Sequence, residues 1–472
     1  MDRGPVEILR EAQSQMRALG ATACRAHPKV LKNIAKQLEQ HHILSAQELQ
    51  IARLMGIVTT NAIARPSFNN RIFFRYELST RSPGPPQVPK TAVASVDSKR
   101  PKKRNVHAIA LLVDFPDNKG TRRVRDFENL LFNKANRNSM TNFYGQLSYG
   151  ALDLTGEVIG YVRAPQPYSY YTARQSGTGT DYPNNTPGLL HDALTTFCRS
   201  DNLARFDADD DGFVDAIFLI HAGHGAEAEP NPSKRKNMIW SHTWTLPRPF
   251  VHQGVKVFAY STEPEDGRAG VFSHEFGHLL GLPDLYDTTF RSHGVGEWCL
   301  MAAGSWGGKG NRPSRMSCWC LSKLGWIKPK LVTRKRSIQL NTLEAKKTEC
   351  YRVWKKGATG PEYFLLENRQ AKGLDAALPG SGLAVWHIDE RQSNNDNPLA
   401  YLVALLQADG NKDLELLKNS GDAGDLFPGD KGVAAIHDNT TPSTRSNKGS
   451  PSRVTLTNIA MSGGIVRLQA EV

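Results

Sequence analysis

Hydrophobic residues form short continuous runs and helical spacings that alternate along the chain from about residue 105 onwards. His107–Val113 and Ala216–Ile220 are almost entirely apolar, which is typical of strands buried on both faces. Apolar residues recur at helical spacing in Phe127–Phe132, Leu189–Phe197 and Val271–Leu280. The alternation predicts an α+β fold whose strands and helices form one domain over residues 105–330.

The pattern changes after Trp326, where most segments have the character of strands. Glycine, proline, asparagine and aspartate separate short apolar runs, so we expect a β-rich C-terminal module over residues 331–472. The predicted strands are Tyr363–Glu367, Gly382–Ile388, Leu402–Gln407, Gly432–Ile436, Arg453–Leu456 and Gly464–Leu468.

The first part of the chain differs from the rest in pattern. Residues 1–80 are predicted to form a small helical N-terminal region, with three short helices over 6–56. Residues 81–104 form a Pro-rich basic linker that ends in Lys102-Lys103-Arg104. This ending fits a solvated linker, a site for a trypsin-like protease or a localisation signal. We predict that the whole segment is a removable inhibitory prosegment.

Charge is distributed unevenly along the 472 residues, whose formal net charge is +13. Residues 1–104 hold 18 Lys and Arg against 7 Asp and Glu, whereas the remaining 368 hold 41 against 39. The net charge of residues 105–472 is therefore close to zero, which argues against nucleic acid as a partner. No apolar run approaches the length of a membrane span, and the start of the chain shows no pattern of a secretory signal.

The segment Ser273–Asp284 carries the strongest chemical signal in the chain. On a helix, His274 and His278 lie one turn apart on the same face, where two imidazoles can bind one zinc ion. Glu275 follows the first ligand and can act as a general base. A buried helix with two hydrogen-bonded core histidines is the alternative, but it would bury Glu275 without a cation.

A third ligand is predicted a few residues beyond the helix. Gly281 can adopt the backbone angles that end a helix sharply, so the chain can turn back and present Asp284. Three protein ligands and one water are typical of a catalytic zinc site rather than a structural one.

Several segments together resemble the immune inhibitor A family of metallopeptidases. They are Ala108–Asp117, Leu147–Gly150, His221–Glu227, His274–Asp287 and Glu297–Trp306. The last includes Met301, and the resemblance implies a metzincin-like domain in which this methionine lies beneath the metal. It further implies a mixed, twisted sheet that supports the metal helix. Members of the family are usually secreted.

From the motif and the resemblance we predict a zinc-dependent endopeptidase with protein or peptide substrates, acting as a monomer. His274, His278 and Asp284 would bind one zinc, and Glu275 would take a proton from water and pass it to the leaving amine. Two alternatives are a zinc amidohydrolase acting on a non-peptide or cell-wall amide, and a non-catalytic binding protein that contains a metal.

A second metal site is predicted in the turn Asp207–Asp215. Asp207, Asp209, Asp211 and Asp215 occupy the first, third, fifth and ninth places of a calcium-loop pattern, with glycine at the sixth. The twelfth place is Phe218, so a full EF-hand is excluded and a structural calcium turn or a plain Asp-rich turn remains.

Other residues with metal-binding chemistry carry weaker signals. We interpret Asp409, Asn411, Asp413, Asp422 and Asp425 as polar turns rather than a metal site. His221 and His224 are excluded from the zinc ligands, and the six cysteines are expected to be reduced or packed. A thiolate of Cys24 could cap the zinc, but the local sequence offers only the neighbouring Arg25 in its favour.

Overall fold

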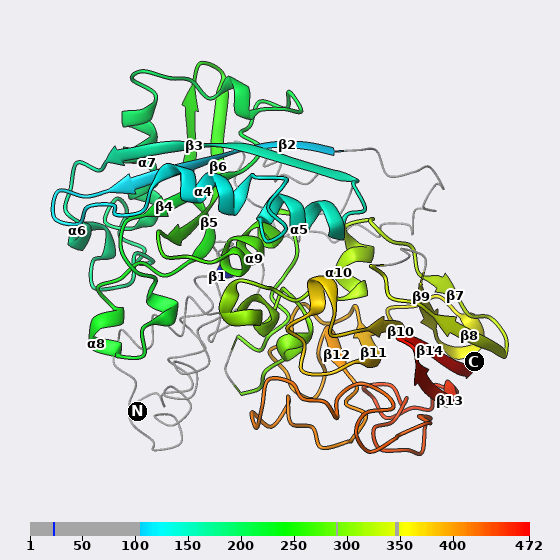
Figure 1. Ribbon diagram of the computed structural model, residues 1–472. Coiled ribbons are helices and arrows are strands. Elements are labelled where there is room, and N and C mark those ends of the chain that lie inside the picture. Colours follow the sequence, from blue (N-terminus) through cyan, green and yellow to red (C-terminus); the bar gives the residue numbers. More distant parts are fainter. Residues whose placement is uncertain (1–21, 24–103, 289–290, 345–348) are drawn as a thin grey trace, which may run out of the picture.

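The computed structural model describes residues 22–23, 104–288, 291–344 and 349–472 (Figure 1). The helices predicted over residues 6–56, Cys24 and nearly all of the basic linker lie outside the described residues. The five described cysteines, Cys198, Cys299, Cys318, Cys320 and Cys350, are free thiols, as predicted.

A mixed six-stranded sheet forms the centre of the first part of the fold. Its strands, in spatial order, are β1 (Thr22–Ala23), β5 (His242–His252), β6 (Val255–Pro264), β4 (Ile217–His221), β2 (Arg104–Asp114) and β3 (Leu152–Arg163). Strands β3, β2, β4 and β6 are parallel, whereas β5 and β1 are antiparallel to their neighbours. The predicted strands at His107–Val113 and Ala216–Ile220 are thus confirmed within one residue or a few.

Helices cover both faces of this sheet because its central strands are apolar on both sides. Ala108, Ala110 and Leu112 of β2 pack in one core with α4 (Val124–Leu131), α5 (Met140–Leu147) and α9 (Ala269–Leu279). The alternate residues Ile109 and Leu111 pack in a second core with α6 (Tyr168–Thr172) and α7 (Thr186–Phe197). Successive side chains of β2 therefore point to opposite faces of the sheet, and each face packs against its own layer of helices. A short helix, α8 (Pro232–Arg235), precedes β5.

Two smaller sheets follow helix α10 (Cys318–Lys323), as the strand pattern predicted. The first contains β12 (Val403–Leu405), β11 (Gly382–Asp389), β10 (Glu362–Arg369), β9 (Cys350–Val353) and β7 (Lys330–Leu331). The second contains β13 (Thr455–Ser462), β14 (Ile465–Glu471) and β8 (Arg336–Leu340). The strand predicted at Gly432–Ile436 is wrong: only Ile436 forms a bridge, to Leu456, because turns surround it.

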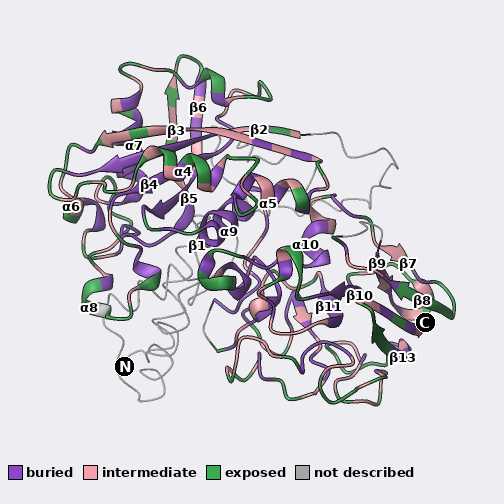
Figure 2. Cartoon of the chain, viewed as in Figure 1, coloured by how far each residue is buried: buried purple, intermediate pink, exposed green. Residues whose placement is uncertain are grey.

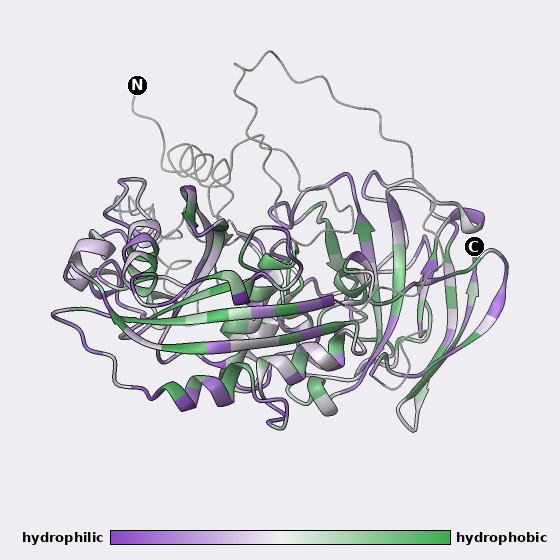
Figure 3. Ribbon diagram, turned by 90° about the horizontal axis from the view of Figure 1, so that it is seen from above, coloured by the Kyte–Doolittle hydropathy of each residue, from purple (hydrophilic) through white to green (hydrophobic). Residues whose placement is uncertain are grey.

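One hydrophobic core connects the two parts of the chain. Phe276 of α9 and Met301 belong to the same buried cluster as Leu366 of β10 and Trp386 of β11. Buried residues are continuous from α9 through α10 into the C-terminal strands (Figure 2). Hydrophobic and hydrophilic residues alternate along these strands (Figure 3). The helix that holds the predicted metal ligands and the β-rich region therefore share one hydrophobic core.

Candidate metal centre

Helix α9 holds two of the predicted ligands and ends just after them. It is buried on all sides, which its nearly uninterrupted small and apolar sequence permits. The Gly281 N–H donates to the His278 carbonyl (2.8 Å), and the Leu282 N–H donates to the Gly277 carbonyl (3.1 Å). Gly281 has a φ of +91°, in the region that favours glycine, and its turn brings Asp284 back towards the helix.

Three ligand atoms converge at the end of this turn. His274 Nε2 and His278 Nε2 are 3.1 Å apart, and each lies 3.2 Å from Asp284 Oδ1. With zinc–nitrogen distances of 2.0–2.1 Å, two ligands of a tetrahedral zinc ion are about 3.3 Å apart. The three atoms therefore have the separation of one face of a zinc tetrahedron.

The hydrogen bonds of the two histidines determine which ring nitrogen carries the proton, and they leave the nitrogens that face the site as acceptors. His274 Nδ1 lies 2.9 Å from the Leu300 carbonyl, and His278 Nδ1 lies 2.8 Å from the Leu282 carbonyl. Because a carbonyl only accepts, both Nδ1 atoms carry the proton, and neutral rings then present lone pairs at Nε2. Three facing acceptors fit a cation.

Glu275 lies beside these ligands and is fully buried. Its Oε2 accepts a hydrogen bond from Thr243 Oγ1 of β5 (2.9 Å). Oε1 has no hydrogen-bond partner among the described residues. Burial raises the pKa of Glu275 to about 8, against the opposing effects of His274 and Thr243. Thr243 was not identified from the sequence. Strand β5 contains polar and apolar residues, and no pattern among them indicates which one faces Glu275.

Met301 packs directly beneath the metal helix. A β-carbon on Gly277 would lie 2.5 Å from Met301 Sδ, so only glycine lets the thioether approach this close. The Met301 carbonyl accepts the Leu285 N–H (2.7 Å), next to Asp284. Leu300, one residue earlier, holds His274 through its carbonyl. The segment between the 3-10 helices η3 (Gly296–Trp298) and η4 (Ala303–Gly310) thus positions two of the three ligands.

Neighbouring polar residues take other positions. Asp287 accepts a hydrogen bond from Ser292 Oγ (2.9 Å), and Tyr286 stacks its ring on His274 at 6.3 Å. His221 is buried with Nδ1 against the Ala222 carbonyl. His224 is exposed, and its Nδ1 lies 2.6 Å from Asp266 Oδ2; the hydrogen bond with Asp266 and the charge of that residue raise the pKa of the imidazole. Both histidines lie outside the cluster formed by His274, His278 and Asp284.

The structure brings together three of the four carboxylates of the predicted calcium turn. Ligand oxygens of Asp207, Asp209 and Asp215 lie within 4.8 Å of one another, and Asp211 is not among them. The Asp211 carboxylate instead accepts the Phe213 N–H (3.0 Å). Asp215 is buried, and its Oδ1 has no hydrogen-bond partner in the part of the chain that is described. Burial, with the charge of Asp209, raises its pKa to about 6.

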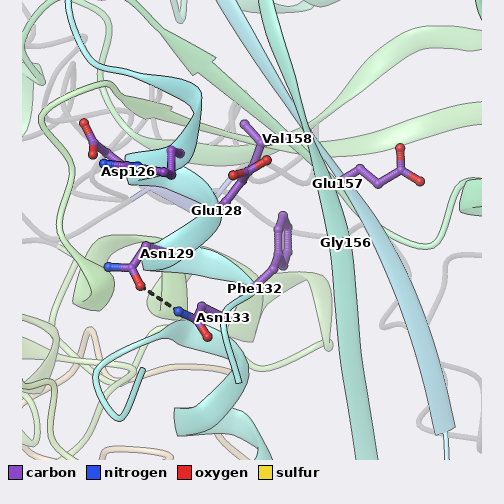
Figure 4. A pocket seen from close by; sticks show the side chains of 9 residues that line it. Asp126, Glu128, Asn129, Phe132, Asn133, Gly156, Glu157 and Val158 are labelled. Atoms are coloured by element: carbon purple, nitrogen blue, oxygen red, sulfur yellow. Dashed lines mark hydrogen bonds between the residues drawn. The ribbon is translucent and has the colours of Figure 1, made fainter. Parts of the chain in front are cut away.

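A groove between α4 and β3 is separate from both clusters. Figure 4 shows its lining, in which Phe132, just after α4, lies beside Gly156 of β3 and acidic side chains surround them. None of the lining residues is a predicted metal ligand, so we assign the groove no part in the chemistry.

Comparison with known proteins finds a family match for the region that holds the three predicted ligands. Residues 124–328 match the catalytic domain of the immune inhibitor A peptidase M6 family. This M6-like region covers less than half of the chain. The match confirms the resemblance predicted from the motifs, and the matched range includes α9, Asp284 and Met301.

Two named relatives match part of the chain. The chain is 32% identical to the pre-pro-metalloprotease PrtV of Vibrio cholerae, over 52% of this chain and 32% of that protein. It is 35% identical to immune inhibitor A of Bacillus thuringiensis subsp. alesti, over 37% of this chain and 30% of the relative. The matches therefore span about a third of these relatives' length. Within the described residues, no helix has the length and apolar character needed to cross a membrane.

Proposed function

We propose that the M6-like region is a zinc-dependent endopeptidase with a metzincin-like active site. The observation that carries this proposal is the triangle of three acceptor atoms at 3.1–3.2 Å, with the Oε1 of Glu275 beside it. His274, His278 and Asp284 would hold the ion. Zinc, when bound, supplies Lewis acidity that polarises a carbonyl and lowers the pKa of water.

The side chains around the ion perform the proton transfers. Glu275 accepts a proton from the attacking water at Oε1, while Thr243 holds Oε2 and thereby fixes the orientation of the carboxylate. The same Oε1 then returns the proton to the leaving nitrogen. Leu300 and Leu282 keep both imidazoles in the tautomer that can bind metal. Burial of Glu275 excludes bulk water from this proton path.

Casein provides the direct test of the reaction class. The protein is incubated with casein, with and without a zinc chelator, and fragments are separated by electrophoresis. We expect cleavage that the chelator stops and added zinc restores. Cleavage of a small amide with intact casein would support the amidohydrolase alternative. A zinc-loaded protein that cleaves neither would be a binding protein.

We also propose that the Asp207–Asp215 turn binds calcium. The buried Oδ1 of Asp215 would gain a partner, and an ion that binds only the folded state raises stability by about 2.7 kcal/mol at one hundred times its Kd. We expect calcium to raise the melting temperature less in an Asp209→Asn variant than in the unmodified protein. Asp210→Asn is the control, since Asp210 is outside the three-residue cluster. Equal shifts of the melting temperature in both variants would show that the segment is a polar turn that does not bind calcium.

We further propose that residues 1–104 are an inhibitory prosegment. Thr22 and Ala23 form β1, which pairs antiparallel with Thr243 and His242 of β5. Strand β1 therefore occupies the edge of the sheet, directly beside the residue that holds Glu275. An extended peptide substrate adds to a sheet edge by the same main-chain hydrogen bonds, so β1 and a substrate would compete for β5.

Removal of the segment should therefore release activity. A chain that begins at Asn105 is compared with the full chain for solubility, zinc content and rate of peptide cleavage. We expect equal zinc content and a faster rate in the shorter chain. A folded, zinc-loaded short chain that is no faster would assign the segment to docking or localisation instead.

A further inference from the structure

A second group of carboxylates surrounds Gly424 in the C-terminal region. A β-carbon on Gly424 would lie 2.9 Å from Asp409 Oδ2, 3.1 Å from Asp422 Oδ1 and 3.2 Å from Asp430 Oδ1. Three carboxylates from separate points of the chain thus face one small space that glycine keeps free of a side chain. Asp430 is exposed, and Asp409 and Asp422 are half-buried, so an ion can reach them from solvent.

A fourth carboxylate, Asp425, points to a ligand independently of this cluster. Its side chain is 1% exposed, and its Oδ1 has no hydrogen-bond partner within the described ranges. Burial, together with the charges of Asp422 and Asp409, raises the pKa of Asp425 to about 7. A buried carboxylate oxygen without a partner is costly, and a cation removes that cost. Among the described residues no lysine, arginine or histidine forms an ion pair with any of the four.

We propose that Asp409, Asp422, Asp425 and Asp430 form a binding site for a hard divalent cation, with calcium as the ligand. All the donors are oxygens, which calcium prefers and zinc does not. Calcium takes six to eight oxygen ligands at about 2.3–2.6 Å, and each carboxylate can supply one or two of them. Backbone bonds between Asp409 and Gly424, and between Ala408 and Asp425, already hold the two segments together.

This site is connected to the segment that carries Met301. Asp425 Oδ2 accepts the Trp298 indole N–H (2.8 Å), and the Ser420 carbonyl accepts the Glu297 N–H (2.7 Å). Two residues after Trp298, the Leu300 carbonyl orients His274. An ion bound by Asp425 would thus stabilise the support of a zinc ligand, a role that the Asp207–Asp215 turn does not have.

Terbium, a luminescent substitute for calcium, tests the site in the full-length protein. Trp298 lies against Asp425, so excitation of tryptophan should sensitise terbium emission, and calcium should compete it away. We expect Asp430→Asn to weaken calcium competition by about tenfold, since affinity follows the number of charged ligands. Asp430 is exposed and makes none of the hydrogen bonds of the fold described above, so this variant should remain folded.

Three comparison variants make the outcome specific. Asp413→Asn, in the same loop but paired with Lys418 at 3.0 Å, should leave the emission unchanged. Asp209→Asn should also leave the tryptophan-sensitised emission unchanged, whereas Trp298→Phe should abolish most of it and retain calcium binding. Sensitised emission that is absent, or that persists with equal affinity in Asp430→Asn and Asp422→Asn, would overturn the proposal.

Discussion

Replacement of Glu275 by glutamine is expected to lower kcat by about 10²–10⁴-fold while zinc stays bound. Glutamine has the same shape and can still accept the hydrogen bond from Thr243, but it cannot take a proton from water. The metal ligands His274, His278 and Asp284 are untouched. Turnover of a chromogenic peptide and zinc content by mass spectrometry are measured on the same preparation.

A second substitution separates proton transfer from orientation. Thr243→Val removes the hydroxyl that holds Glu275 Oε2 but leaves the base in place, so we expect a smaller loss of kcat than in Glu275→Gln. If Glu275→Gln were as active as the unmodified protein, Glu275 would have no part in the mechanism. A loss of zinc in this variant would instead assign it a structural role.

Asp284→Ala is expected to weaken zinc binding more than any neighbouring carboxylate substitution. Its Oδ1 lies 3.2 Å from both imidazole Nε2 atoms, so alanine removes one of three ligands. Loss of an outer partner typically costs about 10–100-fold in affinity, and loss of a ligand should exceed that range. Zinc affinity is determined by competition with a chelator of known affinity.

Asp287→Ala is the matched control for this measurement. Asp287 is three residues further along the chain and is buried, but its carboxylate accepts a hydrogen bond from Ser292 rather than facing the two histidines. We expect a loss within or below the 10–100-fold range. A larger loss in Asp287→Ala than in Asp284→Ala would show that the third ligand is misassigned.

The convergence of His274, His278 and Asp284 was predictable because local spacing determines it. His274 and His278 must share a face of any helix, and Gly281 marks the helix end from which Asp284 returns. The uniformly apolar strands β2 and β4 were equally clear, since burial on both faces leaves continuous runs in the sequence.

The residues that were missed act through tertiary contacts. Thr243 reaches Glu275 from β5, 32 positions away, and no local pattern indicates that pairing. Asp211 fits the spacing of a calcium loop, yet its carboxylate caps its own turn instead. Asp409 and Asp422 were interpreted as parts of polar turns, because their convergence on Gly424 depends on loops that periodicity does not describe. Gly432–Ile436 failed as a strand for the same reason.

The shared core of α9 and the C-terminal strands has a consequence for how the protein unfolds. Arg369 of β10 donates to the Trp298 carbonyl (2.7 Å) and pairs with Asp375, which in turn accepts the Arg315 N–H. Separation of the chain near residue 330 would strip these partners and expose the apolar surface between Phe276 and Trp386. We therefore expect that the matched region 124–328 does not fold without the strands that follow it. Heat should disrupt both parts in a single cooperative transition, and zinc bound at one end should protect strands at the other.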